Sequence, residues 1–317
     1  MAFWRGDWFN ALTPVFEAKL LGMIVNYFSS FHVYTFTLVS GFIYYHVKYH
    51  RDGYNIFSSF IQKKAKRLLV PYVFVAIVWA IPFYIAFYHP DIVDVLKKYG
   101  LGESPSQLWF LLMLFEVFAL SWVLSDIYRK VKWSVFVPLV FYIIAVLGSS
   151  MLPNVFNIWN ACRHLIMFWL GFKFCQYGML NRVKVWQLIA VFSIHMMLFV
   201  VLTIISGRDG SFWILAEKGV EMFVRISGAV MAFSVLQFFG EIVNWKDSKI
   251  FVDFSKKSMP IYLFHQQLIY LTIWLLNGKI NPYLNVFINF VFAVTVAYGI
   301  SSLLMSSRVT RFLIGEK

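Results

Sequence analysis

Nine long apolar stretches follow one another along this chain of 317 residues. Each is near or above the roughly 20 residues that an α-helix needs to cross a hydrocarbon core about 30 Å thick. Lipid admits only helices and closed barrels, and runs this long and continuously apolar exclude barrel strands. The pattern predicts an all-α polytopic membrane protein with about nine transmembrane helices. The stretches lie at residues 20–46, 68–88, 106–124, 133–151, 158–178, 184–206, 212–239, 258–277 and 284–305.

The composition agrees with a single membrane domain. Hydrophobic residues make up 60% of the chain and charged residues only 14%, and the mean hydropathy is +0.70. Soluble domains carry about 25% charged residues on average. The sequence shows no repeat, low-complexity segment or long polar linker that separates a second domain. We therefore expect residues 1–317 to form one integral-membrane domain.

Lysines and arginines fall mainly in alternate gaps between the apolar stretches. Nineteen of the 28 lie in or beside one set of gaps, seven lie in the other set, and two lie inside stretches. Cytoplasmic segments of membrane proteins are enriched in Lys and Arg, so the carboxyl terminus is predicted to be cytoplasmic and the amino terminus to lie outside. The net charge of +13 does not indicate a nucleic-acid partner, because the basic residues lie beside membrane ends rather than on one soluble face.

Five short motifs occur in order along most of the chain. They are Phe31-His32 with Ser40-Gly41, the basic run 63–67 before Pro71-Tyr72, Leu108-Trp109-Phe110-Leu111, the aromatic run 168–172, and Tyr262-Leu263-Phe264-His265. In this order and spacing they resemble the membrane-bound acyltransferase family 3, in its sugar and polysaccharide O-acetyltransferase branch. The resemblance implies an enzyme of the bacterial cytoplasmic membrane, an acyl-CoA-dependent O-acyltransferase. It would move an acetyl or similar small acyl group from cytoplasmic acyl-CoA to a hydroxyl of a cell-surface glycan or lipid-linked sugar precursor.

The amino-terminal end departs from the family pattern. Members usually have ten transmembrane helices and begin with a helix that bears a basic residue and a catalytic histidine. Residues 1–19 resemble the loop that follows this helix. We expect the first helix to be absent, through a late-assigned start or true loss. An inactive truncated member is therefore one alternative, and a polysaccharide or sugar exporter is another, since charges inside a membrane also serve transport.

Lys64 and Arg67 are neighbours at helical spacing on the predicted cytoplasmic side, just before Pro71, which is expected to open the second span. In an interfacial helix over this run, the residues predicted to face lipid are Phe57, Phe60, Ile61 and Leu68, and those predicted to face water are Lys63, Lys66 and Arg67. Arginine binds phosphates through paired hydrogen bonds and lysine as a point charge, so the pair is predicted to bind acyl-CoA. The resemblance implies the same, with Lys64 in place of one arginine of the family pair. Alternatively, these charges only set topology beside anionic lipid headgroups.

His32 lies inside the first apolar stretch, where an ionisable group is costly and is a functional candidate. A neutral imidazole can accept the proton of a sugar hydroxyl that attacks a thioester, so His32 is the predicted catalytic base. The competing interpretation is a hydrogen bond to a neighbouring helix. Ser40-Gly41 in the same stretch indicates close helix contact rather than a nucleophile.

Four residues are candidates for binding the acceptor: Trp109, Glu116, Arg163 and His265. An indole such as that of Trp109 can stack on a pyranose ring. Glu116 and Arg163 are ionisable groups in predicted spans and should face a polar cavity. His265 matches the late histidine of the family, with hydrogen bonding between helices as its competing role.

Two other polar pairs occur at helical spacing. Glu221 and Arg225 can pair along their own helix or line an outward vestibule. His46 and His50 are four residues apart at a predicted cytoplasmic helix end, without further ligands nearby in the sequence. We therefore expect no metal cofactor. The sequence gives no indication of the oligomeric state.

Overall fold

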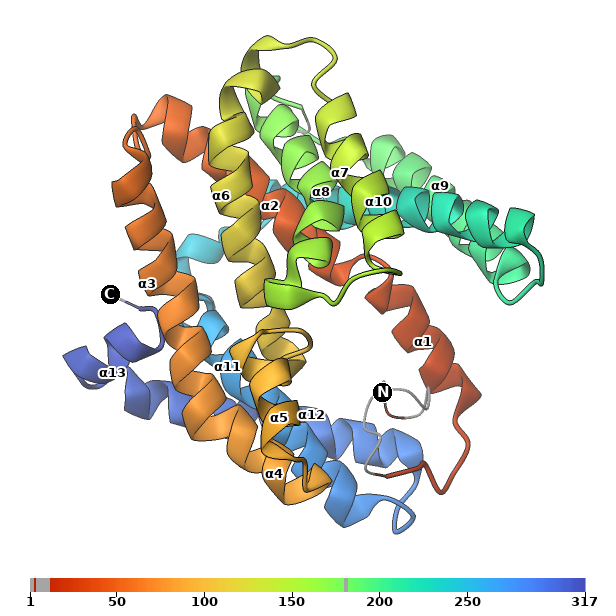
Figure 1. Ribbon diagram of the computed structural model, residues 1–317, viewed down its shortest axis with the longest axis vertical. Helices are drawn as coiled ribbons and strands as arrows, with labels where there is room; N and C mark the ends of the chain where they lie inside the picture. Colours follow the sequence, from red (N-terminus) through yellow and green to blue (C-terminus); the bar gives the residue numbers. More distant parts are fainter. Residues whose placement is uncertain (1–2, 4–11, 180–181, 317) are drawn as a thin grey trace.

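The computed structural model describes residue 3 and residues 12–179 and 182–316, and every regular element over these residues is a helix (Figure 1). The predicted all-α class is confirmed. The expectation that residues 1–19 form an outer loop falls mostly outside the described residues. The α-helices are α1 Lys19–Ser29, α2 His32–Tyr45, α3 Phe57–Val75, α4 Ile81–Tyr88, α5 Ile92–Val95, α6 Trp109–Lys130, α7 Phe136–Gly148, α8 Ile158–Gln176, α9 Val185–Ile205, α10 Ser211–Ile242, α11 Lys249–Leu276, α12 Pro282–Leu304 and α13 Arg308–Leu313.

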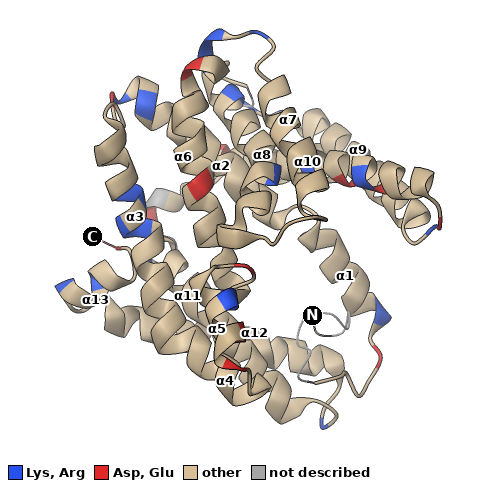
Figure 2. Ribbon diagram, in the orientation of Figure 1, with Lys and Arg blue, Asp and Glu red and all other residues tan. Residues whose placement is uncertain are grey.

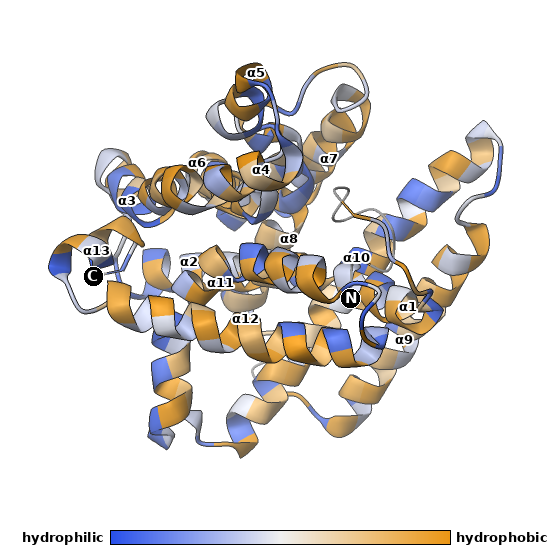
Figure 3. Cartoon of the chain, turned by 90° about the horizontal axis from the view of Figure 1, so that it is seen from below, coloured by the Kyte–Doolittle hydropathy of each residue, from blue (hydrophilic) through white to orange (hydrophobic). Residues whose placement is uncertain are grey.

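Five helical segments in the described part of the chain are long and apolar enough to cross a membrane, and α7 is a shorter apolar helix. The protein is therefore polytopic, whereas the total of nine spans stays a prediction. Large apolar side chains such as Phe287, Phe290 and Leu303 on α12 are exposed, as a lipid-facing surface requires. Figure 3 shows that hydrophobic residues predominate along the helices. The five segments are Phe57–Tyr88, Ser106–Lys130, Val185–Ile205, Ser211–Ile242 and Pro282–Leu304.

The first apolar stretch is divided between α1 and α2. Phe31 between them has a non-helical backbone, with φ −139°. Its ring is buried and packs edge-on against His195 of α9, with centroids 5.3 Å apart. A Cβ at Gly228 of α10 would lie 2.5 Å from the Phe31 Cβ, so glycine makes room for this side chain. Tertiary packing therefore interrupts a stretch that is apolar throughout.

α3 and α4 form one continuous helical path over residues 57–88, through a π-helical turn. Pro71 lies inside α3 and does not open a span, which corrects the sequence-based expectation. Proline has no N–H for the carbonyl of Arg67, four residues earlier. Gly315 packs against that carbonyl, where a Cβ would lie 2.6 Å from the oxygen. The segment after α13 thus covers a backbone group that Pro71 leaves without its helical partner.

α2 and α8 pack closely along their length, and α8 also contacts α6 and α7. Gly41 and Gly171 make this approach possible. A Cβ at Gly41 would lie 2.0 Å from the carbonyl oxygen of Phe168, and one at Gly171 would lie 1.9 Å from that of Leu38. The predicted role of Gly41 in close helix contact is confirmed. Small residues serve this purpose in membranes because they let helix backbones approach.

Two hydrogen bonds each join gaps of similar charge content. Lys48 donates to Ser125 Oγ near the end of α6 at 2.6 Å, which joins two gaps rich in Lys and Arg. The Phe156 N–H donates to the Leu101 carbonyl at 2.7 Å, which joins two gaps poor in them. The middle parts of the helices carry little charge (Figure 2). The contacts follow the alternation of charge, while the assignment of the basic side to the cytoplasm stays a prediction.

Gly171→Ala is expected to destabilise the protein, because the added carbon meets the Leu38 backbone. Overpacking typically costs about 1–3 kcal/mol. The matched control is Gly299→Ala on α12, where nothing lies within 4 Å of the new Cβ. Alanine there should stabilise the helix by up to about 1 kcal/mol. Thermal unfolding of both purified variants in detergent measures the difference, and equal melting temperatures would contradict the close α2–α8 contact.

Candidate functional site

A cavity of about 690 Å³ lies between the α3–α4 end, the segment before α6, the start of α8 and the middle of α11. We name it the amide cavity, because five carboxamide side chains and several aromatic rings line it. Lys98, Glu103 and two serines add further polar groups to its wall. Such a mixture offers hydrogen-bond donors, acceptors and flat apolar surfaces in one space. The amides are Gln107, Asn157, Asn160, Gln266 and Gln267, and the rings include Tyr84, Trp109 and Tyr270.

A reciprocal amide pair forms one wall of the amide cavity. Gln107 Nε2 donates to Gln267 Oε1 at 2.8 Å, and Gln267 Nε2 donates back to Gln107 Oε1 at 3.1 Å. Gln107 also donates to the Leu263 carbonyl at 2.8 Å, and the Tyr262 hydroxyl donates to the Gln107 carbonyl. Gln107 and Gln267 are both buried. These bonds hold the segment before α6 against α11, and they satisfy polar groups that would be costly to bury alone.

The segment before α6, which contributes Lys98 and Tyr99 to the lining of the amide cavity, is also held by hydrogen bonds to its backbone carbonyls. The Tyr72 hydroxyl donates to the Tyr99 carbonyl at 2.5 Å, and Asn157 Nδ2 donates to the Gly102 carbonyl at 2.5 Å. Burial raises the pKa of the Tyr99 phenol to about 12 and lowers the pKa of the Lys98 amine. The Lys98 amine lies 4.3 Å from the centroid of the Tyr84 ring. The wall therefore carries a partly desolvated cation beside aromatic rings.

His164 lies behind Trp109 and is 3% exposed. Its Nδ1 lies 2.8 Å from the Asn160 carbonyl, and because a carbonyl only accepts, Nδ1 donates in this contact. That leaves Nε2 as the nitrogen that can take a proton, and Nε2 has no hydrogen-bond partner among the described residues. The imidazole stacks on Tyr34 at 4.5 Å, and the Arg225 guanidinium lies 4.9 Å from the same Tyr34 ring. His164 is thus a buried imidazole whose Nε2 has no partner among the described residues, and its ring centroid lies 5.9 Å from that of Trp109, which lines the amide cavity.

His32, the predicted base, is exposed at the start of α2. Its Nδ1 lies 3.0 Å from the Phe28 carbonyl, so its Nε2 is also the nitrogen able to accept a proton. His32 does not line the amide cavity. Of the predicted acceptor residues, the structure places only Trp109 in the cavity lining.

Lys64 and Arg67 lie on α3 but point to different surroundings. The Lys64 amine is half-buried and lies 3.5 Å from the centroid of the Phe118 ring, with the Tyr54 ring at 5.1 Å. Arg67 is exposed. Phe60, expected to face lipid, is buried beside the Lys64 amine, and Leu68 is also buried, which corrects the predicted helix face. The buried face of α3 turns Lys64 inward because Phe60, Lys64 and Leu68 are four residues apart.

A second lysine lies close to these rings. The Lys48 amine is 4.6 Å from the centroid of the Trp122 ring, and the Trp122 indole N–H donates to the Tyr54 carbonyl at 2.9 Å. We call Lys48, Tyr54, Lys64, Phe118 and Trp122 the lysine–aromatic cluster. No salt bridge in the described part of the chain involves either lysine. Desolvated ammonium groups over aromatic faces gain cation–π energy, which offsets part of the cost of burial.

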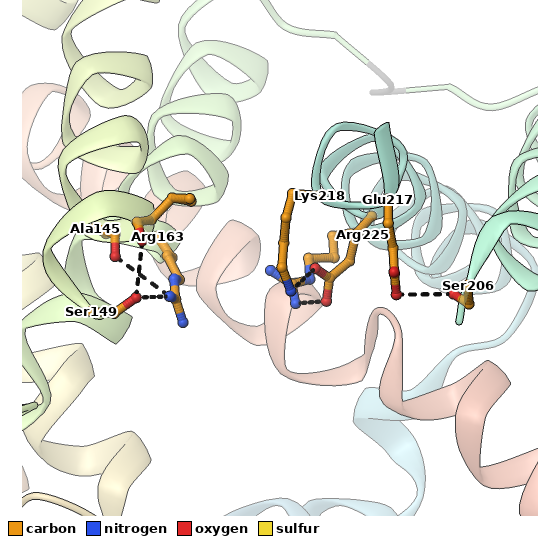
Figure 4. A network of polar contacts seen from close by, with 9 residues as sticks. Ala145, Ser149, Arg163, Ser206, Glu217, Lys218 and Arg225 are labelled. Atoms are coloured by element: carbon orange, nitrogen blue, oxygen red, sulfur yellow. Dashed lines mark hydrogen bonds and ion pairs between the residues drawn. The ribbon is translucent and has the colours of Figure 1, made fainter. Parts of the chain in front are cut away.

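Arg163, Glu116 and His265 lie outside the lining of the amide cavity. Arg163 donates to Ser149 Oγ at 2.5 Å and to the Ala145 carbonyl at 3.4 Å, which joins α8 to α7 (Figure 4). Glu116 has one buried oxygen without a partner among the described residues. His265 Nδ1 lies 2.7 Å from the Tyr262 carbonyl of its own helix, so the hydrogen bond runs within α11 and not between helices.

The pair on α10 forms as expected. The Arg225 guanidinium donates to Glu221, and the Lys218 amine lies 3.5 Å from the same carboxylate (Figure 4). Because Arg225 also lies over Tyr34, this ion pair is continuous with the stack that holds His164.

The sequence model of the acyltransferase 3 family, described as an acyltransferase domain, matches residues 2–306. The chain belongs to this family. No curated protein and no solved structure matches it. As a family member with several apolar spans, the protein is a multi-pass membrane acyltransferase.

Two features of this acyltransferase could not be assigned from the motifs. The amide cavity depends on neutral side chains, such as Gln107 and Asn157, that carry no strong signal in a sequence scan. His164 follows Arg163 inside a predicted span, and its ionisable ring in an apolar run was the available signal. The rings that contact it, Tyr34 and Trp109, lie on other helices, so these contacts could not be predicted from the sequence.

Gln267→Leu in this acyltransferase is expected to lower stability by about 1–3 kcal/mol, because it leaves the buried Gln107 amide unpaired. Gln107→Leu with Gln267→Leu should recover part of this loss, since both polar partners are then replaced by apolar groups. Thermal unfolding of the two single variants and the double variant gives the coupling energy. Additive losses would show that the reciprocal pair does not form.

Proposed function

We propose that this protein moves an acetyl or similar small acyl group from cytoplasmic acyl-CoA to a hydroxyl of a cell-surface glycan or lipid-linked sugar precursor. It would act in the cytoplasmic membrane of a bacterium. The amide cavity is the observation that carries the proposal on the acceptor. Sugars present hydroxyls that carboxamides can both donate to and accept from, and apolar ring faces that stack on aromatic side chains. Trp109 and the five amides supply both kinds of contact.

The lysine–aromatic cluster supports a phosphate-bearing donor on the opposite face. Lys48 and Lys64 bring two ammonium groups among aromatic rings, and Arg67 adds an exposed guanidinium on α3. Acyl-CoA combines phosphates with a flat adenine ring, so cations and aromatic surfaces together suit it. In this proposal Arg67 is the first contact for the donor phosphates, and Lys64 lies deeper.

The reaction needs a base for the acceptor hydroxyl. The hydroxyl oxygen attacks the thioester carbonyl, the base takes its proton, the carbon–sulfur bond breaks, and the CoA thiolate leaves and is protonated. Both His32 and His164 present an Nε2 that can take this proton. We favour His164, because its ring is held by Asn160 and Tyr34 and lies next to Trp109 at the cavity.

The donor assignment is tested with purified protein in nanodiscs, labelled acetyl-CoA and a panel of glycan acceptors. Lys64→Ala with Arg67→Ala is expected to raise the donor KM at least tenfold, because the phosphates lose two cations. Lys63→Ala with Lys66→Ala is the matched control, since it removes two exposed charges from the same helix. Equal changes of the donor KM in the two double variants would contradict the donor assignment and would indicate that all four charges only set the membrane topology.

The transfer assay, together with measurement of surface glycan on cells with and without the protein, separates the enzyme from the alternatives. Transfer by the wild-type protein supports the proposal. No transfer to any acceptor, together with glycan that reaches the surface only when the protein is present, would favour an exporter. Absence of both effects would identify an inactive family member.

His164→Gln is expected to lower kcat at least 100-fold while both KM values stay within a few-fold, because general-base catalysis typically contributes 10²–10⁴. The glutamine amide can still donate to the Asn160 carbonyl, so the packing is largely kept. His32→Gln is the comparison and should change kcat little. A large loss in His32→Gln with little change in His164→Gln would assign the base to His32 instead.

A further inference from the structure

The structure brings three metal-binding side chains together at one end of the α2–α8 pair. His46 and His50 are the first and last residues of a π-helical turn that continues α2, and Cys175 lies in the last turn of α8. One ligand atom from each side chain lies within 4.8 Å of the other two. From the sequence alone no metal is expected here, because no third ligand lies close to the two histidines along the chain. The fold supplies it from a residue more than a hundred positions away.

The spacing of the two histidines already suits coordination. Their Nδ1 atoms lie 3.2 Å apart. Zinc–nitrogen bonds of about 2.0–2.1 Å in a tetrahedral site place two nitrogen ligands roughly 3.3 Å apart. The Nδ1 atoms of the two imidazoles thus lie close enough for both to donate their lone pairs to one metal ion.

The surroundings allow a metal to enter and hold the ligands in place. His50 is exposed, and His46 and Cys175 are half-buried, so the point between them opens toward water. Tyr45 packs edge-on against the His50 ring at 5.4 Å and against Phe172 of α8 at 4.8 Å. Neither cysteine of the described chain forms a disulfide, which leaves the Cys175 thiol available as a ligand.

We propose that His46, His50 and Cys175 form a binding site for a divalent transition metal, with zinc as the best match. Two imidazoles and one thiolate are borderline-soft ligands of the kind that zinc prefers, and water would complete a tetrahedron. Metal binding releases the thiol proton of Cys175, and the resulting thiolate charge stabilises the bound dication. The metal would join the ends of α2 and α8 on the face that carries Lys48. The three ligands do not line the amide cavity and do not belong to the lysine–aromatic cluster, so metal binding can be measured without the proposed reaction.

Cobalt(II) is the probe, added to the full-length protein purified in detergent without a polyhistidine tag. We expect one equivalent to bind, with a thiolate-to-cobalt charge-transfer band and the visible bands of tetrahedral cobalt, and zinc should displace it. His50→Ala should weaken binding at least tenfold. Because His50 is exposed, this variant is expected to fold. Cys175→Ser should abolish the charge-transfer band.

Two control variants make the test specific to this cluster. Cys162→Ser removes the other cysteine, which is buried earlier in α8, and should leave the charge-transfer band unchanged. His89→Ala removes an exposed histidine far along the chain and should leave the affinity unchanged. Failure of the wild-type protein to bind cobalt or zinc stoichiometrically at micromolar concentration would overturn the proposal. Binding that survives both His50→Ala and Cys175→Ser would overturn it as well.

Discussion

The backbone contact between α2 and α8 is the constraint on which the described structure depends. Lipid tails are as apolar as the helices, so helix association in a membrane relies on close packing rather than on the hydrophobic effect. Gly41 and Gly171 let two backbones meet with no side chain between them. The contact sets the rotation of α2 relative to α8. It therefore determines which side chains of the two helices meet.

Three such pairs follow the two helices from end to end. Tyr34 stacks on His164 near one end, Tyr44 packs on Phe168 at 5.4 Å in the middle, and His46 approaches Cys175 at the other end. Tyr34 and His46 are twelve positions apart, which corresponds to a helical rise of roughly 18 Å. A small rotation of α2 would therefore change the setting of the proposed base and of the proposed metal site together. Both depend on the same two glycines.

Local signals in the sequence explain what could be predicted. A membrane span must be apolar at nearly every position, so the helices were visible as runs of residues. The interruption at Phe31 was not visible, because its cause is a space beside Gly228, nearly two hundred residues later. The direction of Lys64 was also missed, since Phe118 and Tyr54 lie on other segments. The amide pair joins Gln107 and Gln267, 160 positions apart, and neither residue type marks a site by itself.

Some of the basic residues have a structural role beyond topology. Lys173 belongs to the set that predicts the cytoplasmic side, yet it is 5% exposed and donates to the Tyr128 carbonyl and, at 3.0 Å, to Gln176 Oε1. Its ammonium group therefore joins the ends of α6 and α8. A count of charges treats such a lysine and an exposed one alike, although only the buried one shapes the fold. The same distinction separates Lys64 from Arg67.

The separation of the two proposed binding regions has a physical rationale. Both lie along α6, with Trp109 at the amide cavity and Trp122 in the lysine–aromatic cluster, thirteen residues and roughly 20 Å of helical rise apart. Phosphates are too strongly hydrated to move into a low-dielectric interior, so they must stay at an aqueous end with cations. The thioester of acyl-CoA lies at the far end of a long, largely uncharged arm from those phosphates. A scaffold that holds the phosphates at one face and the sugar at the other thus needs to admit only the neutral arm between its helices, and the charged parts of both substrates remain in water.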